Sequence, residues 1–158
     1  MIIGIVSDSH DNLDAVREAV EILKENGVER ILHAGDIVAP FAAKVFLEVG
    51  VPVDAVFGNN DGEKTKLTEL LPGIALGARK LRLEGKAVVL VHDRKKLPAR
   101  ELELAEVLVH GHTHEAEVKR DGRRLEINPG EVGGWLTGKK TLAIWNTESE
   151  LPEIVDFS

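Results

Sequence analysis

The feature that most constrains the fold is a unit that occurs three times in the first half of the chain: a short apolar run, a polar loop and an amphipathic segment. The apolar runs span residues 2–6, 30–33 and 53–57, and the predicted helices span 13 to a stop near 27, 41–48 and 64–71. Continuous apolar, β-branched runs are typical of strands buried on both faces of a parallel sheet. Three such units predict a mainly parallel sheet with right-handed crossovers, in which ligands bind beyond the carboxyl ends of the strands.

The second half of the chain is richer in predicted strands. Apolar patterns predict strands over residues 80–83, 86–91, 107–109, 115–119, 123–127, 142–145 and 153–157, with one short helix over 99–105. Asp121-Gly122 is a signal for a two-residue hairpin turn between the fourth and fifth of these strands. A parallel α/β half followed by a β-rich half predicts an α/β protein of two packed sheets with helices outside.

Length and composition limit the remaining classes of protein. With 158 residues and 43% hydrophobic content, residues 1–158 are expected to form one domain, which would bury about two thirds of the unfolded chain's surface. A formal net charge of −7 argues against a general nucleic-acid binder. The lack of cysteine excludes thiolate chemistry and is compatible with a cytoplasmic location. No stretch approaches the ~20 apolar residues of a membrane span, and residues 1–6 are predicted to be a strand and not a signal segment.

Polar side chains recur at the ends of the predicted strands. They are Asp8, His10, Asp36, Asn59, His92, His112 and His114. Taken singly, each has an ordinary interpretation, because an aspartate after a strand often caps a helix and a lone histidine is often a hydrogen-bonded structural residue. Together they place four of the six histidines at one end of a sheet, which favours a metal site. His33 and His110 lie in or at the edge of a strand, and we expect hydrogen-bonded structural roles for them.

The stretch 107–114 carries two of these residues on a single loop. Its apolar run breaks off at Gly111, and two imidazoles follow, two residues apart. If the backbone stays extended past Gly111, His112 and His114 leave it on the same side, because side chains in a strand repeat every second residue. This strand end is then expected to offer two nitrogen ligands to one site.

The types of ligand limit the metal. Imidazole and carboxylate without thiolate suit Mn, Fe, Co, Ni or Zn better than Ca or Mg, which prefer oxygen ligands. Seven ligand side chains are too many for one such ion, whereas two ions that share a bridging carboxylate would use them all. A two-metal site of this kind activates water and clamps a phosphoryl group for in-line displacement.

The chain resembles the calcineurin-like metallophosphoesterases, and in particular their small single-domain phosphodiesterase branch. The resemblance rests on five motifs in the same order: Asp8-Ser9-His10, Gly35-Asp36, Gly58-Asn59-Asn60-Asp61, His92 and Gly111-His112-Thr113-His114. Each motif alone is weak, but five in order are specific and cover nearly the whole chain. Asn128-Pro129-Gly130 is also similar to a turn of that branch. The family fold is implied: two mixed β-sheets sandwiched between helices, in a four-layer αββα arrangement.

The resemblance also implies roles for the seven residues. One metal would be held by Asp8, His10, Asp36 and His114, and the other by Asp36, Asn59, His92 and His112. Asp36 is then the bridge, and it forms the catalytic group together with Asn59 and His92. The implied cofactors are two divalent transition-metal ions per chain, with Mn favoured and Ni, Fe, Co or Zn as alternatives, and the implied chemistry is attack on phosphorus by a water that the metals activate.

Two departures from the family pattern bear on chemistry. Many members follow the liganding Asn with a His that protonates the leaving group, but this chain has Asn60, which cannot donate a proton in that way. A Gly often follows the His equivalent to His92, but this chain has the charged run 93–96. A solvated charge run is the favoured interpretation of 93–96, and a contribution to substrate binding is the alternative.

The function that this pattern favours is a metal-dependent phosphodiesterase acting on a small or nucleotide-like phosphodiester. One alternative is a non-catalytic scaffold, because the resemblance extends to a retromer subunit, although all seven ligand positions are filled here. Another is a phosphomonoesterase or protein phosphatase, which the absence of a histidine at position 60 disfavours. The natural substrate, the native metal and the oligomeric state, including a homo-oligomer, stay open.

Overall fold

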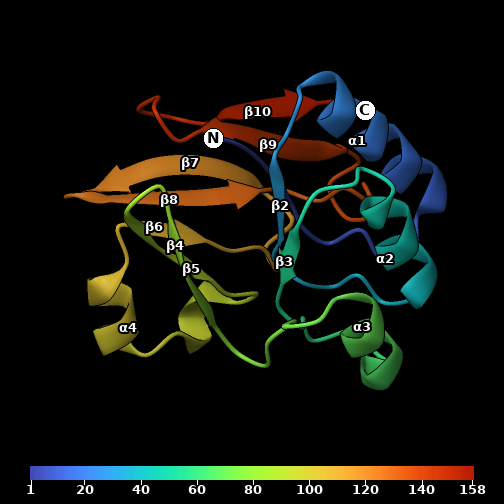
Figure 1. The fold of residues 1–158 in the computed structure, drawn as a ribbon, viewed down its shortest axis with the longest axis horizontal. Helices are drawn as coiled ribbons and strands as arrows, with labels where there is room; N and C mark the ends of the chain where they lie inside the picture. The colour runs from blue at the N-terminus through green and yellow to red at the C-terminus, as the bar shows by residue number, and fades with distance from the viewer.

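The computed structural model describes residues 1–158, whose strands form two five-stranded sheets (Figure 1). The first sheet has the order β10-β9-β1-β2-β3, with the bounds β1 Ile2–Val6, β2 Arg30–His33, β3 Val53–Ala55, β9 Thr141–Asn146 and β10 Glu153–Asp156. β1, β2 and β3 are parallel, whereas β9 runs antiparallel to both β1 and β10. The first sheet is therefore mixed, with its three β–α units in the predicted parallel arrangement.

The second sheet is built from the β-rich half of the chain. Its order is β4-β5-β6-β8-β7, with the bounds β4 Arg79–Leu83, β5 Lys86–Leu90, β6 Val107–Val109, β7 Ala116–Asp121 and β8 Arg124–Pro129. β5, β6 and β8 are parallel, and β4 and β7 are antiparallel edge strands. This sheet is mixed too.

Helices cover the outer faces of both sheets. In Figure 1, α1, α2 and α3 lie beside the first sheet and α4 lies at the far side of the second. Their bounds are α1 Leu13–Glu25, α2 Pro40–Leu47, α3 Lys64–Leu70 and α4 Ala99–Leu104, and a short 3-10 helix, η1, spans Arg94–Lys96. The predicted fold class, two mixed sheets sandwiched between helices, is confirmed.

The alternation of side chains along the strands produces these layers. On β1, Ile3 and Ile5 pack in the core between the sheets, whereas Val6 packs in the core under the helices of the first sheet. On β6, Val107 faces the inter-sheet core and Leu108 faces α4. Successive strand residues point to opposite faces, so continuous apolar runs are what a sheet buried on both faces requires.

Two predicted segments differ from the structure. β3 ends at Ala55, two residues early, because Val56 bridges to Ala75 and the strand pairing stops there. The hairpin turn between β7 and β8 is Gly122-Arg123 and not Asp121-Gly122, because Asp121 pairs with Arg124. Gly122 has a φ of 61° and Arg123 has no positive φ, which matches a type II′ turn with glycine first.

The other predicted strands and helices agree with the structure to within one or two residues at each end. None of the helices is long and apolar enough to cross a membrane. The carboxyl ends of β1, β2 and β3 lie at one edge of the first sheet because these strands are parallel, and β5 and β6 likewise end together. The polar loops that follow them are therefore brought close to one another.

Candidate metal centre

A first cluster of potential ligands joins the ends of β1 and β2 to the loop after β6. Its ligand atoms come from Asp8, His10, Asp36 and His114 and lie within 4.8 Å of one another. Nε2 of His10 lies 3.2 Å from Oδ2 of Asp36 and 3.7 Å from Oδ1 of Asp8. Nε2 of His114 lies 3.4 Å from the same Asp8 oxygen. Both aspartates are buried and the His10 side chain is partly exposed, although its Nε2, which faces the cluster, is buried.

A second cluster lies beside the first and contains the remaining predicted ligands. Oδ1 of Asn59 lies 2.8 Å from Nε2 of His92 and 3.1 Å from Nδ1 of His112. The two ring nitrogens are 3.2 Å apart. The structure thus brings all seven predicted residues together, in two groups.

Asp36 lies between the two groups. Its Oδ2 is 3.2 Å from Nε2 of His10 and 3.6 Å from Nε2 of His92. Asn60 fixes the carboxylate, with its backbone N–H donating to Oδ1 at 2.8 Å and its side-chain amide donating to Oδ2 at 2.9 Å. Burial alone raises the pKa of Asp36, but contact with His10 and the bonds from Asn60 outweigh it and hold the pKa well below its usual range.

The buried polar atoms of both clusters fit bound cations. Oδ1 of Asp8 and Nε2 of His10 are buried and make no hydrogen bond. Nδ1 of His92 donates to the Ala34 carbonyl oxygen at 2.7 Å, which leaves Nε2, 2.8 Å from Oδ1 of Asn59, as the ring nitrogen available to a metal. A transition metal binds N and O at about 2.0–2.2 Å, so two ligands of one ion lie roughly 3 to 3.6 Å apart. Most of the spacings in both clusters are close to this range.

Five of the seven residues have left-handed backbone conformations. The φ angles are 52° at Asp8, 42° at His10, 57° at Asp36, 69° at His112 and 64° at His114. Such conformations are uncommon for residues with a Cβ, and each costs on the order of 1–3 kcal/mol. Their concentration at one place is the pattern of a functional site rather than of a loop shaped only for stability.

The expectation that the backbone stays extended past Gly111 is wrong. His112 and His114 both have positive φ, so the loop coils and directs His112 to the second cluster and His114 to the first. Hydrogen bonds from distant parts of the chain hold this shape. The backbone N–H of His112 donates to Oδ2 of Asp8, and the Asn128 amide donates to Oγ1 of Thr113 at 2.8 Å.

Glu131, which was not predicted, fixes the orientation of His114. This glutamate is fully buried, and its Oε2 pairs with Nδ1 of His114. A carboxylate only accepts, so Nδ1 carries the proton and Nε2 is left free to bind a metal. Burial alone raises the pKa of Glu131, but the bonds from His114, Thr137 and Leu136 outweigh it and lower the pKa.

Two further buried residues support the ligands and were also missed as functional residues. Oγ of Ser7 donates to Oδ2 of Asp8, which leaves Oδ1 to face the cluster. Asp61 accepts from the backbone N–H groups of Asp36, Val38 and Gly58 at 2.6 to 3.0 Å and so ties the β2 and β3 loops together. Asp61 lies within a quoted motif, whereas nothing in the sequence around Ser7 distinguishes it.

The two histidines expected to be structural differ from each other. His33 accepts from the backbone N–H of Gly35 at 3.1 Å and lies 3.3 Å from Oγ of Ser9, and burial lowers its pKa to about 4. His33 is therefore a neutral, hydrogen-bonded core residue. His110 is buried as well, and burial lowers its pKa, but its Nδ1 has no hydrogen-bond partner.

The carboxylates give the centre a negative potential. The adjacent carboxylate of Asp36, followed by that of Asp8, raises the pKa of His10 to about 10. The same field that draws a proton to His10 would draw a divalent cation into the first cluster, where the cation would displace that proton.

The charged run 93–96 is not simply solvated. Asp93 caps η1 by accepting from the backbone N–H of Lys95, and it lies 3.8 Å from Nε2 of His112. Arg94 forms an ion pair with buried Glu126. Lys96 lines a cavity of about 190 Å³ beside the second cluster, and the other lining residues include Phe57, Asn59, Lys64, Leu76 and His92.

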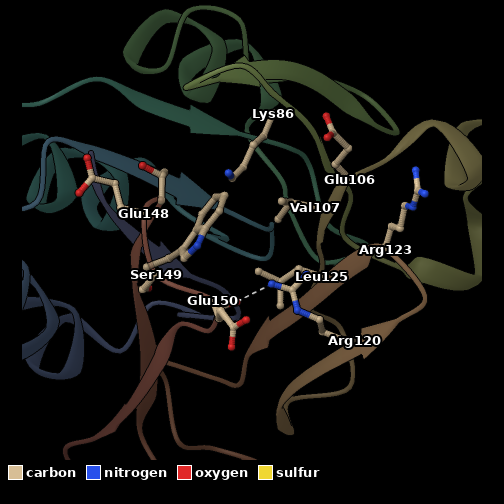
Figure 2. Close-up of a pocket in the computed structure, with 11 residues that line it drawn as sticks. Lys86, Glu106, Val107, Arg120, Arg123, Leu125, Glu148, Ser149 and Glu150 are labelled. Carbon is tan, nitrogen blue, oxygen red and sulfur yellow. Dashed lines mark hydrogen bonds between the residues drawn. The ribbon is translucent and has the colours of Figure 1, made fainter.

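A second cavity, of about 270 Å³, lies at the opposite end of the strands (Figure 2). It is lined near the start of β5, the start of β6 and the end of β9 and contains none of the predicted ligands. Its lining has three basic residues, Lys86, Arg120 and Arg123, and three acidic ones, Glu106, Glu148 and Glu150. All seven predicted ligands therefore lie outside this cavity.

The fold and the two clusters define a class of protein. Two mixed sheets between helices, with Asp, His and Asn gathered beyond the strand ends, form the architecture of a metallophosphoesterase. The chain belongs to the calcineurin-like phosphoesterase superfamily, whose domain model matches residues 1–150.

Two relatives that are named as phosphodiesterases are similar to this protein over most of the chain. Phosphodiesterase MJ0936 of Methanocaldococcus jannaschii is 37% identical over 167 residues, which cover 98% of this chain and 99% of the relative. Phosphodiesterase YfcE of Escherichia coli K12 is 30% identical over 143 residues, covering 80% and 76% of the two chains.

Solved structures agree with this placement. An archaeal phosphodiesterase superposes with a TM-score of 0.87 at 33% identity, over 99% of this chain and 100% of that chain. Vps29 of Chaetomium thermophilum has the same fold, with a TM-score of 0.78 at 16% identity, over 99% and 89% of the chains.

Proposed function

We propose that this protein is a dinuclear metal-dependent phosphodiesterase that hydrolyses a small or nucleotide-like phosphodiester. The observation that carries the proposal is the position of Oδ2 of Asp36, which faces His10 of the first cluster and His92 of the second. A carboxylate oxygen shared by two sets of ligands suits a pair of ions that it bridges. The similarity to MJ0936 and YfcE, both described as phosphodiesterases, supports the same activity.

We infer that the cofactors are two divalent transition-metal ions per chain, with Mn favoured. When bound, they would supply an activated water at neutral pH and positive charge against the phosphate oxygens. Asp8, His10 and His114 would hold one ion, Asn59, His92 and His112 the other, and Asp36 both. Asn60 would keep Asp36 in the bridging orientation through its two hydrogen bonds.

The leaving group receives little help from residue 60. An amide cannot protonate a departing alkoxide, and the Asn60 amide is already directed at Asp36. General-acid catalysis typically increases the rate by about 10²–10⁴-fold, and residue 60 cannot supply this contribution here. The enzyme should therefore favour diesters with leaving groups that depart as stable anions, such as aryl esters.

The cavity beside the second cluster supports a small substrate. Its volume of about 190 Å³ lies below the roughly 300–1,000 Å³ of typical ligand pockets. Lys64 and Lys96 line it, with Nζ of Lys64 5.6 Å from the centroid of the Phe57 ring, and their positive charges would attract the phosphodiester. A general nucleic-acid substrate does not fit a chain with a net charge of −7.

The alternative functions are less well supported. A scaffold that has lost catalysis has no need of the seven predicted ligands or of the left-handed backbones at five of them, although the Vps29 structures have the same fold. A phosphomonoesterase would bring a second negative charge toward Asp8, Asp36 and Asp93 and would usually need an acid at position 60.

The test is hydrolysis by protein stripped with chelator and reloaded with Mn²⁺. We expect turnover of bis(4-nitrophenyl) phosphate that exceeds turnover of 4-nitrophenyl phosphate in kcat/KM, with no activity in the stripped protein or in Asp36→Asn. Glu126→Gln, which changes a buried acid outside the clusters, is the matched control and should retain activity. A preference for the monoester, or activity that survives Asp36→Asn, would overturn the proposal.

A further inference from the structure

Trp135 and Leu136 form an exposed apolar pair in the loop that joins β8 to β9. Their side chains are 69% and 71% exposed, although the other tryptophan of the chain, Trp145, is only 1% exposed. Single exposed apolar residues are common, but an exposed indole beside an exposed leucine is a small apolar surface of the kind found at binding sites.

The loop that carries this pair is tied to the first cluster by backbone hydrogen bonds. The N–H of Val132 donates to the Ser7 carbonyl oxygen at 3.0 Å, and the N–H of Gly133 donates to the Asp8 carbonyl oxygen at 3.1 Å. The N–H of Leu136 donates to Oε1 of Glu131, the same carboxylate that orients His114. The exposed pair is thus held in a fixed relation to the candidate metal ligands.

The indole lies near the segment that carries Asp8, with Gly133 beside both. A methyl group added at Gly133 would be 2.9 Å from Cδ1 of Trp135, 3.0 Å from the Ser9 carbonyl oxygen and 3.1 Å from the Asp8 carbonyl oxygen. Asn12 holds Gly133 from the other side by donating to its carbonyl oxygen at 2.7 Å. Trp135 is therefore held near the backbone of Asp8 and Ser9, at the edge of the first cluster.

We propose that Trp135 is a substrate-binding residue that stacks on a planar aromatic arm of the phosphodiester, a nucleobase or an aryl group. The inference rests on the proposed function and narrows its substrate class. On this proposal, a phosphate held at the two clusters would direct one ester arm toward Trp135 and the other toward the cavity that Lys64 and Lys96 line. The lysine side suits an anionic or polar arm, whereas the indole and Leu136 suit an aromatic one.

Tryptophan is well suited to this role. Stacking on an aromatic side chain is sequence-tolerant, because every base has a π face, and alanine substitution typically weakens binding by about fivefold to 150-fold per base. Because Trp135 offers only one partly open face, the loss of binding on its substitution should lie toward the lower end of that range. An indole fixed by its loop also loses little freedom when a ring binds to it.

The test compares two ligands that share a phosphate and a ribose and differ only in the base. AMP and ribose 5-phosphate are titrated calorimetrically into Mn²⁺-loaded wild type, Trp135→Ala and Trp135→Phe. We expect Trp135→Ala to raise the Kd of AMP roughly tenfold and leave that of ribose 5-phosphate unchanged, and Trp135→Phe to restore most of the AMP affinity. Leu151→Ala removes an exposed leucine from the turn between β9 and β10 and should change neither Kd.

A spectroscopic measurement gives a second readout. AMP should quench the tryptophan fluorescence of the wild type but not that of Trp135→Leu, because the remaining Trp145 is shielded in the core. Equal weakening of both ligands, no change in either, or a shift from oligomer to monomer on light scattering of Trp135→Ala would overturn the proposal. The last result would assign the pair to contact with a second copy of the chain.

This experiment separates the inference from the proposed function, because it measures binding and not turnover. If the wild type fails to hydrolyse any diester but binds AMP through Trp135, the proposed activity is wrong and the stacking site stands. If the wild type hydrolyses diesters and Trp135→Ala binds AMP as tightly as the wild type does, the stacking site is wrong and the activity stands.

Discussion

Replacing Glu131 with Gln should weaken one metal site and leave the other intact. Oε1 of Glu131 accepts from the N–H of Leu136 at 2.9 Å and from the N–H and Oγ1 of Thr137 at 2.7 and 2.9 Å. The glutamine oxygen would keep these three bonds, so the loop should stay in place. The new amide would then point its N–H groups at Nδ1 of His114, which would have to accept, and the ring proton would move to Nε2, the atom that should bind the metal.

The size of the effect follows from the one hydrogen bond that changes. A hydrogen bond to a charged group contributes about 1.5–3 kcal/mol, and loss of such an outer partner typically reduces metal affinity roughly 10–100-fold. The hydrogen-bond energy and the loss of metal affinity agree in size, since 1.4 kcal/mol corresponds to about tenfold in an equilibrium constant. The loss should fall on the first cluster, because Glu131 contacts His114 and none of Asn59, His92 or His112.

The assay is a calorimetric titration of chelator-stripped protein with Mn²⁺, with wild type, Glu131→Gln and Glu126→Gln compared side by side. Glu126 is as deeply buried as Glu131 but contacts Arg94, Arg124 and Lys119, so its substitution controls for loss of a buried acid. Glu131→Gln should weaken one of two binding steps, and Glu126→Gln neither. Unchanged affinities, or two steps weakened equally, would refute the tautomer argument.

Two further predictions concern Asn60 and Glu126. Asn60→His should raise kcat/KM for diesters with poor alkyl leaving groups relative to bis-aryl phosphate, at intact metal content by elemental analysis; an unchanged ratio would mean that the missing acid does not shape specificity. The ion pairs of Glu126 with Arg94 and Arg124 outweigh the effect of burial and lower its pKa from 4.5 to about 2. The pKa of Glu126 is lower in the folded state than in the unfolded state, so its ionised form stabilises the fold by an amount on the order of 3 kcal/mol. This stabilisation is present above about pH 4.5 and is lost as the pH falls toward 2. Urea unfolding of stripped protein should therefore show the advantage of wild type over Glu126→Gln shrinking by roughly 2 kcal/mol between pH 7 and pH 3, and a constant difference would contradict it.

Most of the fold follows from local patterns. The apolar run 2–6 had to be buried on both faces, and Ile3, Ile5 and Val6 are divided between two cores as that requires. The turn at Gly122 could not be placed exactly from its residues, because Asp-Gly fits a type I′ turn and the strand pairing decides in favour of the type II′ turn one residue later.

The candidate site was predictable where it depends on strand ends and not where it depends on distant partners. The gathering of the seven predicted residues in two adjacent groups follows from polar residues after parallel strands and from the family motifs. The coiled shape of the loop 111–114 does not, because it is fixed by Asp8 and Asn128, which are far away in sequence. Glu131 was missed for the same reason, since a glutamate in a loop is ordinarily a surface residue.

The exposed position of Trp135 could not be predicted from the sequence either. An isolated tryptophan in a sequence predicts a buried side chain more often than a surface one, and only the backbone hydrogen bonds of its loop place it beside Asp8.

The most direct test of the central claim is the number of metal ions that each chain binds. Protein stripped with chelator, reloaded with Mn²⁺ and passed through a desalting column should contain two ions per chain by elemental analysis. Asp36→Asn should weaken both sites, since Oδ2 of Asp36 faces both clusters. A wild-type stoichiometry of one or none at saturation would contradict the dinuclear account.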